Sequence, residues 1–80
     1  MYPVLDLRTR LKIAWHLREH GFSVRMHSFE YLVGDGKRFV AIILVDPSGR
    51  AEVIKLSPEA QLVAELVRTA APKAEVRIVE

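Results

Sequence analysis

Two histidines and a glutamate at the end of the first predicted helix have the spacing of a zinc-binding motif. The segment from His16 to His20 reads H-L-R-E-H. Two imidazoles four residues apart on a helix can share one Zn²⁺, with the glutamate beside them. A zinc enzyme also needs a third ligand and a substrate cleft. Gly21 ends the helix directly, and a chain of 80 residues leaves little room for a cleft. We therefore expect two solvated histidines and no metal site.

A second set of residues has the types that metal-dependent nucleases use. The carboxylates of Glu30, Asp46 and Glu52 are of the kind that hold Mg²⁺, and Lys55 is of the kind that orients an attacking water. However, positions 52 and 55 of one strand point to opposite faces of a sheet. His27 could serve as an acid–base group, but a half-exposed strand histidine is the simpler interpretation. We expect no catalytic residue and no cofactor, and an enzyme is the least favoured class.

Basic side chains concentrate in the first half of the chain. Residues 1–40 hold seven Lys and Arg against four acidic residues, whereas residues 41–80 hold five against six. Clustered basic residues are typical of phosphate-binding surfaces, although a solvated helix face is the ordinary alternative. We expect phosphate contacts from the first helix, the first strand and a hairpin turn, through Arg8, Lys12, Arg25, Lys37 and Arg38.

Hydrophobic periodicity predicts a helix over residues 5–20, with Asp6 as its N-cap and Gly21 as its C-cap. Its apolar positions form one broad arc on the helical wheel, which we expect to face the core: Leu7, Leu11, Ile13, Ala14, Trp15 and Leu17. Arg10 and Arg18 fall inside this arc. They are expected to extend past it to water or to mark a partner surface.

Three strands are expected next. Residues 22–33 alternate between apolar and polar side chains. The apolar side chains lie at even positions up to Met26 and at odd positions from Phe29 on, and this change of parity predicts a bulge or bend near His27 and Ser28. Residues 34–37 form a hairpin turn. Residues 39–45 are apolar on both faces, which is typical of a central strand covered on both sides. A turn at residues 46–49 leads to the third strand, residues 51–56.

A second helix and a last strand complete the predicted fold. Ser57 as N-cap and Pro58 as the first helical residue start the helix, which runs to about Ala71, and Pro72 stops it. Residues 74–79 form the final strand. The order is α-β-β-β-α-β. It predicts one α+β domain over residues 1–80: a four-stranded mixed sheet in which a three-stranded antiparallel meander is followed by a right-handed βαβ crossover, with a helix for each face.

The composition is that of a globular chain. It is 50% hydrophobic and 28% charged, has a net charge of +2 and contains no cysteine, which excludes disulfides and cysteine-ligated zinc. The longest apolar run, residues 39–45, is too short to span a bilayer, and no secretion signal is evident. We therefore predict a cytoplasmic protein without membrane contact. The absence of asparagine and the excess of arginine over lysine fit a thermophilic source or a GC-rich genome.

Three stretches carry a resemblance to a known fold. Residues 17–24 run from a helix through Gly21 and Phe22 into a strand, residues 57–61 place Gln61 in a helix after the third strand, and residues 66–79 form a closing helix and strand. Together with the element order, they resemble the restriction-endonuclease-like fold of PD-(D/E)XK nucleases, Holliday-junction resolvases and the catalytic-type domain of tRNA-splicing endonucleases. That family needs acid-x-Lys on the third strand, where this chain has Lys55 and Ser57. The resemblance therefore implies a nuclease-like fold without a competent catalytic site.

These observations predict a non-catalytic module that binds DNA or RNA through phosphate contacts, with weak sequence preference. The alternative is a protein-interaction or structural subunit, either a homodimer or a partner in a larger nuclease complex, that pairs through an edge strand. A metal-dependent nuclease is the third and least favoured hypothesis.

Overall fold

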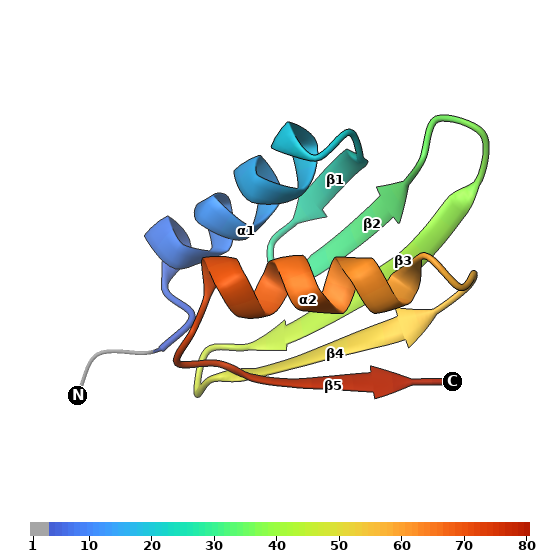
Figure 1. The fold of residues 1–80 in the computed structure, drawn as a ribbon. Helices are drawn as coiled ribbons and strands as arrows, with labels where there is room; N and C mark the ends of the chain where they lie inside the picture. Colours follow the sequence, from blue (N-terminus) through green and yellow to red (C-terminus); the bar gives the residue numbers. More distant parts are fainter. Residues whose placement is uncertain (1–3) are drawn as a thin grey trace.

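The computed structural model describes residues 4–80, which form two helices and one five-stranded sheet (Figure 1). The helices are α1 (Leu7–Glu19) and α2 (Ala60–Ala70), and the strands are β1 (Ser23–His27), β2 (Glu30–Gly34), β3 (Phe39–Asp46), β4 (Arg50–Lys55) and β5 (Glu75–Val79). The strands lie in the sheet in chain order. The first four form an antiparallel meander, and β5 pairs parallel to β4. The predicted α+β class and mixed sheet are confirmed.

The sheet has five strands and not the four that the sequence analysis predicts. The segment read as one strand with a bend is a hairpin, in which His27 of β1 pairs with Glu30 of β2. Ser28 has a φ of 58°, the left-handed conformation that tight hairpin turns require. The change of parity near His27 thus comes from a reversal of the chain. The meander accordingly has four strands.

The irregularity of the sheet lies instead between β2 and β3. Val33 pairs with Ala41 and Gly34 pairs with Phe39, so Val40 is an extra residue on β3. Such a bulge turns two consecutive side chains to one side. Val40 and Ala41 are both fully buried.

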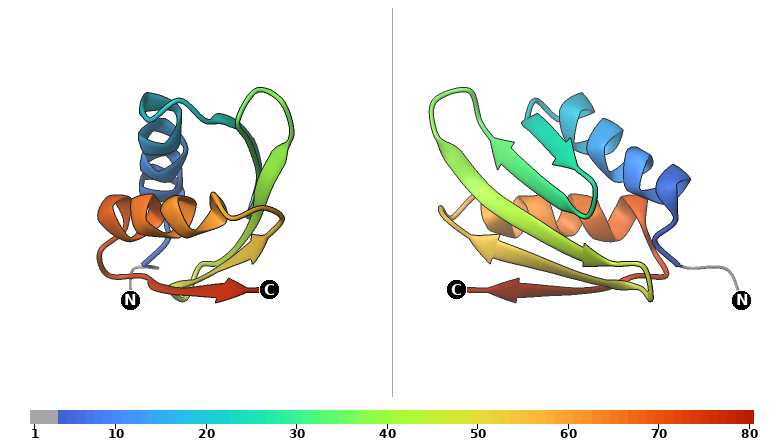
Figure 2. Two further views of the ribbon diagram at one scale, coloured as in Figure 1. Left: turned by 45° about the vertical axis from the view of Figure 1, so that its right-hand side comes forward. Right: turned by 180° about the vertical axis from the view of Figure 1, so that it is seen from behind.

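Both helices lie on the same face of the sheet, so the molecule has two layers (Figure 2). Seen from behind, the sheet lies in front of α2, and α1 lies beside β1. The expectation of a helix on each face is wrong, because the right-handed β4–α2–β5 crossover places α2 beside α1 (Figure 1). Among the described residues, no helix covers the other face.

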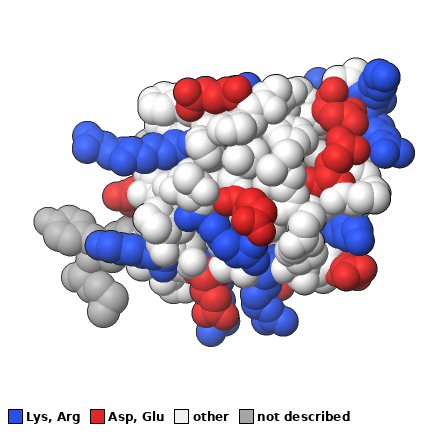
Figure 3. All heavy atoms as spheres, in the orientation of Figure 1, with Lys and Arg blue, Asp and Glu red and all other residues white. Residues whose placement is uncertain are grey.

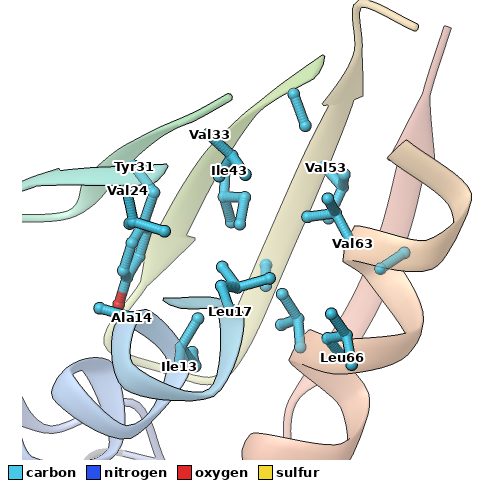
Figure 4. Close-up of a cluster of buried hydrophobic side chains, with 14 of the residues drawn as sticks. Ile13, Ala14, Leu17, Val24, Tyr31, Val33, Ile43, Val53, Val63 and Leu66 are labelled. Carbon is cyan, nitrogen blue, oxygen red and sulfur yellow. The ribbon is translucent and has the colours of Figure 1, made fainter. Parts of the chain in front are cut away.

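The core fills the space between the helices and the sheet (Figure 4). Helix α1 contributes Ile13, Ala14 and Leu17, all fully buried. The sheet and α2 contribute further fully buried side chains: Val33, Ile43, Val53, Val63 and Val67. Leu7 and Trp15, predicted to face the core, are 58% and 55% exposed. The apolar arc of α1 is wider than the strip that the sheet and α2 cover.

The helix ends follow local capping chemistry. The Asp6 carboxylate accepts a hydrogen bond from the Thr9 N–H at 2.9 Å, which confirms Asp6 as the N-cap of α1. Gly21, with a φ of 89°, follows the C-cap region. Helix α2 begins later than predicted, because Ser57 Oγ accepts from the Glu59 N–H within a preceding turn and Glu59 is the N-cap.

Candidate nucleic-acid interface

The outward side of α1 carries an apolar line, of which Leu7 and Trp15 are exposed and Leu11 is partly buried. Leu7, Leu11 and Trp15 follow one another at intervals of four residues, which places them along one side of a helix. The buried residues Ile13 and Leu17 take the opposite side against the core. The side chains of this line are therefore available to a ligand.

Two basic residues lie beside this line. Arg8 and Lys12, one turn apart and both exposed, line a hollow of about 460 Å³ together with Leu7, Leu11 and Trp15. We call these five residues the α1 ridge. Side chains four residues apart on a helix are neighbours, with Cβ atoms about 5–6 Å apart, so the two charges flank one stretch of surface.

Lys12, a member of the α1 ridge, also lies near the C-terminal end of α2. It lines a hollow with Trp15, Glu19 and Thr69, and another with Pro72 and Lys73. Within residues 4–80, the ion pairs closer than 4 Å are Arg38–Glu59, Lys55–Glu80 and Arg68–Glu65. Arg8, Lys12 and Lys73 take part in none of these pairs, so three basic groups on adjoining hollows are open to an anion.

The other basic residues predicted to bind phosphate lie elsewhere. Arg25 is on β1 and points to the face of the sheet that the helices leave uncovered. Lys37 and Arg38 lie in the loop between β2 and β3, and Arg38 contacts the Glu59 carboxylate at 3.5 Å. On the helical face, acidic side chains are interspersed with basic ones (Figure 3). The five residues are therefore distributed over three surfaces.

The two arginines predicted to interrupt the apolar arc of α1 have structural roles. The Arg10 guanidinium donates to the backbone oxygens of Leu5 and Ser28 at 3.2 and 2.9 Å and lies 4.2 Å from the centre of the Phe29 ring. Arg10 thereby ties the β1–β2 turn to α1. Arg18 donates to the Val24 oxygen at 2.8 Å.

Tyr31 is a buried residue of β2 with a polar contact to α1. It is 1% exposed, and its hydroxyl donates to the Arg10 backbone oxygen at 2.7 Å. Burial disfavours the charged phenolate and raises the pKa of Tyr31 well above its usual value, although the nearby Arg10 guanidinium acts in the opposite direction.

The acidic residues considered for a nuclease centre are not arranged as one. The Asp46 carboxylate accepts from the Ser48 N–H at 2.8 Å, and this bond lowers the Asp46 pKa. Lys55 pairs with Glu80 at 3.6 Å. In the described part of the chain, no three acidic, histidine or cysteine residues are placed to hold a metal ion.

The two histidines of the H-x-x-E-H segment contact each other and not a metal-ligand set. Their ring centroids are 4.6 Å apart in an edge-on arrangement, and the His20 Nδ1 lies 2.9 Å from the His16 backbone oxygen. His27 is exposed at the end of β1.

No protein family, curated protein or solved structure matches this chain. The observed order has one hairpin more than the order on which the resemblance to restriction-endonuclease-like proteins rests, and that resemblance stays a prediction. Neither α1 nor α2 is long and apolar enough to cross a membrane.

Sequence reasoning predicts Arg8 and Lys12 as site residues but misses the aromatic residue next to them. Trp15 was assigned to the core because it lies on the same broad arc as Ile13 and Leu17. The signal that could have separated it is its spacing: Trp15 follows Leu7 and Leu11 at intervals of four residues, next to Arg8 and Lys12 on the helix surface. Ile13 and Leu17 lie on the opposite side of α1.

Proposed function

We propose that this protein is a non-catalytic module that binds single-stranded DNA or RNA on the α1 ridge. The observation that carries the proposal is the exposure of the chain's single tryptophan, Trp15, beside Arg8 and Lys12, which form no ion pair within residues 4–80. Exposed aromatic rings next to basic groups are the common means of holding an unpaired strand.

Each group of the α1 ridge has a distinct role in this proposal. Trp15 stacks on a base, which every base permits because every base has a π face. Lys12, one turn before Trp15 on α1, and Arg8, one turn further, contact successive phosphates on one side of that base, and Lys73 extends the track toward the end of α2. Phosphate contacts and stacking carry little sequence information, so we expect weak sequence preference.

An anionic membrane is the competing ligand for such a surface, and the ridge is less suited to it. A membrane-surface helix buries a broad apolar face in the lipid boundary. Here the broad part of the apolar arc, with Ile13 and Leu17, is committed to the core. What remains is one line of three apolar side chains.

Intrinsic fluorescence tests the proposal without a label, because Trp15 is the only tryptophan. Titration with a single-stranded oligonucleotide at low salt should quench its emission, with a dissociation constant on the order of 10–100 µM. Arg8→Gln with Lys12→Gln should weaken binding at least tenfold. Arg25→Gln with Lys37→Gln removes the same charge from other surfaces and should leave binding unchanged.

Two results would overturn the proposal. The first is equal weakening by the two double variants, which would show binding through net charge and not through the α1 ridge. The second is a blue shift of Trp15 emission on phosphatidylserine vesicles together with no response to the oligonucleotide, which would assign the ridge to a membrane surface.

A further inference from the structure

The face of the sheet turned away from the helices carries a continuous apolar row. The pairing registers align Leu32, Ile42, Ile54 and Val79 directly across four neighbouring strands, from β2 to β5. All four are only partly buried. Leu44 lies beside Ile42 on the same side of β3, two residues further along the strand. We call this side of the sheet the open face.

Strand β3 shows why this face needs a cover. Its residues 39–45 are apolar without interruption, a pattern that belongs to strands buried on both faces. The helices cover the side that carries Ile43, which is fully buried. In residues 4–80 nothing lies over the side that carries Ile42 and Leu44 (Figure 2).

We propose that a second copy of this chain covers the open face, so that two sheets pack against each other with the helices outside. Sheets that pack face to face lie about 10 Å apart and are joined by side chains from both inner faces. The apolar row would form the centre of that contact.

The charges on the open face favour a second copy over a strongly charged partner. By the strand registers, the face carries three arginines and four acidic residues around the apolar row: Arg25, Arg50, Arg77, Glu30, Asp46, Glu52 and Glu75. A surface with both signs in nearly equal number can complement itself in a two-fold arrangement. It does not attract a polyanion.

The size of the open face predicts a weak dimer. Five strands about 4.8 Å apart and five residues at about 3.4 Å each give a rectangle of roughly 24 by 17 Å, or about 400 Å² per copy. Stable complexes bury about 800 Å² per partner. We therefore expect a dissociation constant on the order of 10–100 µM and a rapid exchange between monomer and dimer.

Sedimentation velocity over a range of concentrations from about 5 µM to 1 mM tests this inference. The wild type should shift from monomer to dimer across the range. Ile42→Glu should remain monomeric, because it places a charge at the centre of the apolar row. Leu62→Glu makes the same change at an exposed leucine of α2 and should dimerise as the wild type does.

A second variant keeps the test valid if Ile42→Glu does not fold. Arg77→Glu alters an exposed position and changes the face from three arginines and four acids to two and five, so it should weaken the dimer at least tenfold. A wild type that stays monomeric at 1 mM would overturn the inference. So would a dimer that neither Ile42→Glu nor Arg77→Glu weakens, which would place the contact at an edge strand.

The open face and the α1 ridge lie on opposite layers of the molecule (Figure 2), so the two proposals fail independently. Ile42→Glu should leave the oligonucleotide affinity of each monomer unchanged, and Trp15→Ala should leave the dimer unchanged.

Discussion

Replacing Tyr31 with phenylalanine should lower stability at neutral pH and raise it, relative to the wild type, in alkali. The substitution keeps the buried ring and removes the hydrogen bond to the Arg10 oxygen. Such a bond contributes about 0.5–1.5 kcal/mol to the free energy of unfolding. We expect Tyr31→Phe to be less stable than the wild type by about 1 kcal/mol at pH 8.

The alkaline behaviour follows from the raised pKa of Tyr31. In the unfolded chain the phenol ionises at its ordinary pKa of 10.0, whereas in the folded protein burial holds it protonated. The contribution of Tyr31 is therefore complete below pH 10 and is lost as the pH rises above it, by about 1.4 kcal/mol per pH unit. Phenylalanine does not titrate, so the two stability curves should cross near pH ~11.

Urea unfolding of both proteins between pH 8 and 11.5 measures this difference. All other titrating groups, Tyr2 included, are common to the two proteins and cancel in the comparison. A stability gap that stays constant over this range would refute the reasoning, because Tyr31 would then ionise equally well in the folded and unfolded states.

Three further predictions concern the fold. Leu17→Ala removes a fully buried side chain of α1 and should cost about 2–5 kcal/mol in urea unfolding, whereas Leu7→Ala, at an exposed position of the same helix, should cost less than 1 kcal/mol. Gly34→Ala places a methyl group 2.9 Å from the Ser23 Oγ and should lower the melting temperature by several degrees; an unchanged melting temperature would mean that the hairpin end adapts freely. Hydrogen bonds from backbone N–H groups lower the pKa values of Asp6 and Asp46, so the stability that these carboxylates give is present above pH ~4 and should be lost as the pH falls below it, with a smaller loss in the Asp6→Asn variant.

The two ends of α1 were the part of the fold most accessible from the sequence. Asp6 and Gly21 bracket α1 because N-caps and left-handed C-terminal residues have strong local preferences. The hairpin at Ser28 was missed because a two-residue turn without glycine leaves only a change of parity, which a bulge also produces. The layer arrangement was missed because the pattern of β3 predicts cover on both faces and does not say whether this chain or another supplies it.

The candidate site was only partly predictable for a similar reason. Arg8 and Lys12 share a helix, so their spacing fixes their neighbourhood. Arg25, Lys37 and Arg38 depend on how the strands are layered, and no local rule gives that. Trp15 and Leu17 lie on one apolar arc, and only the packing of α1 against α2 and β1 decides which of them is buried.

The central claim is that the α1 ridge binds a single strand through its phosphates. The dependence of oligonucleotide binding on salt concentration tests this claim most directly. Contacts from Arg8, Lys12 and Lys73 predict that the logarithm of the association constant falls against the logarithm of the salt concentration with a slope of about −2, since each phosphate contributes about −0.7 on a single strand. In the Arg8→Gln and Lys12→Gln double variant, the slope should fall to about −0.7. A slope that is the same in both proteins, or no binding at low salt, would contradict the account.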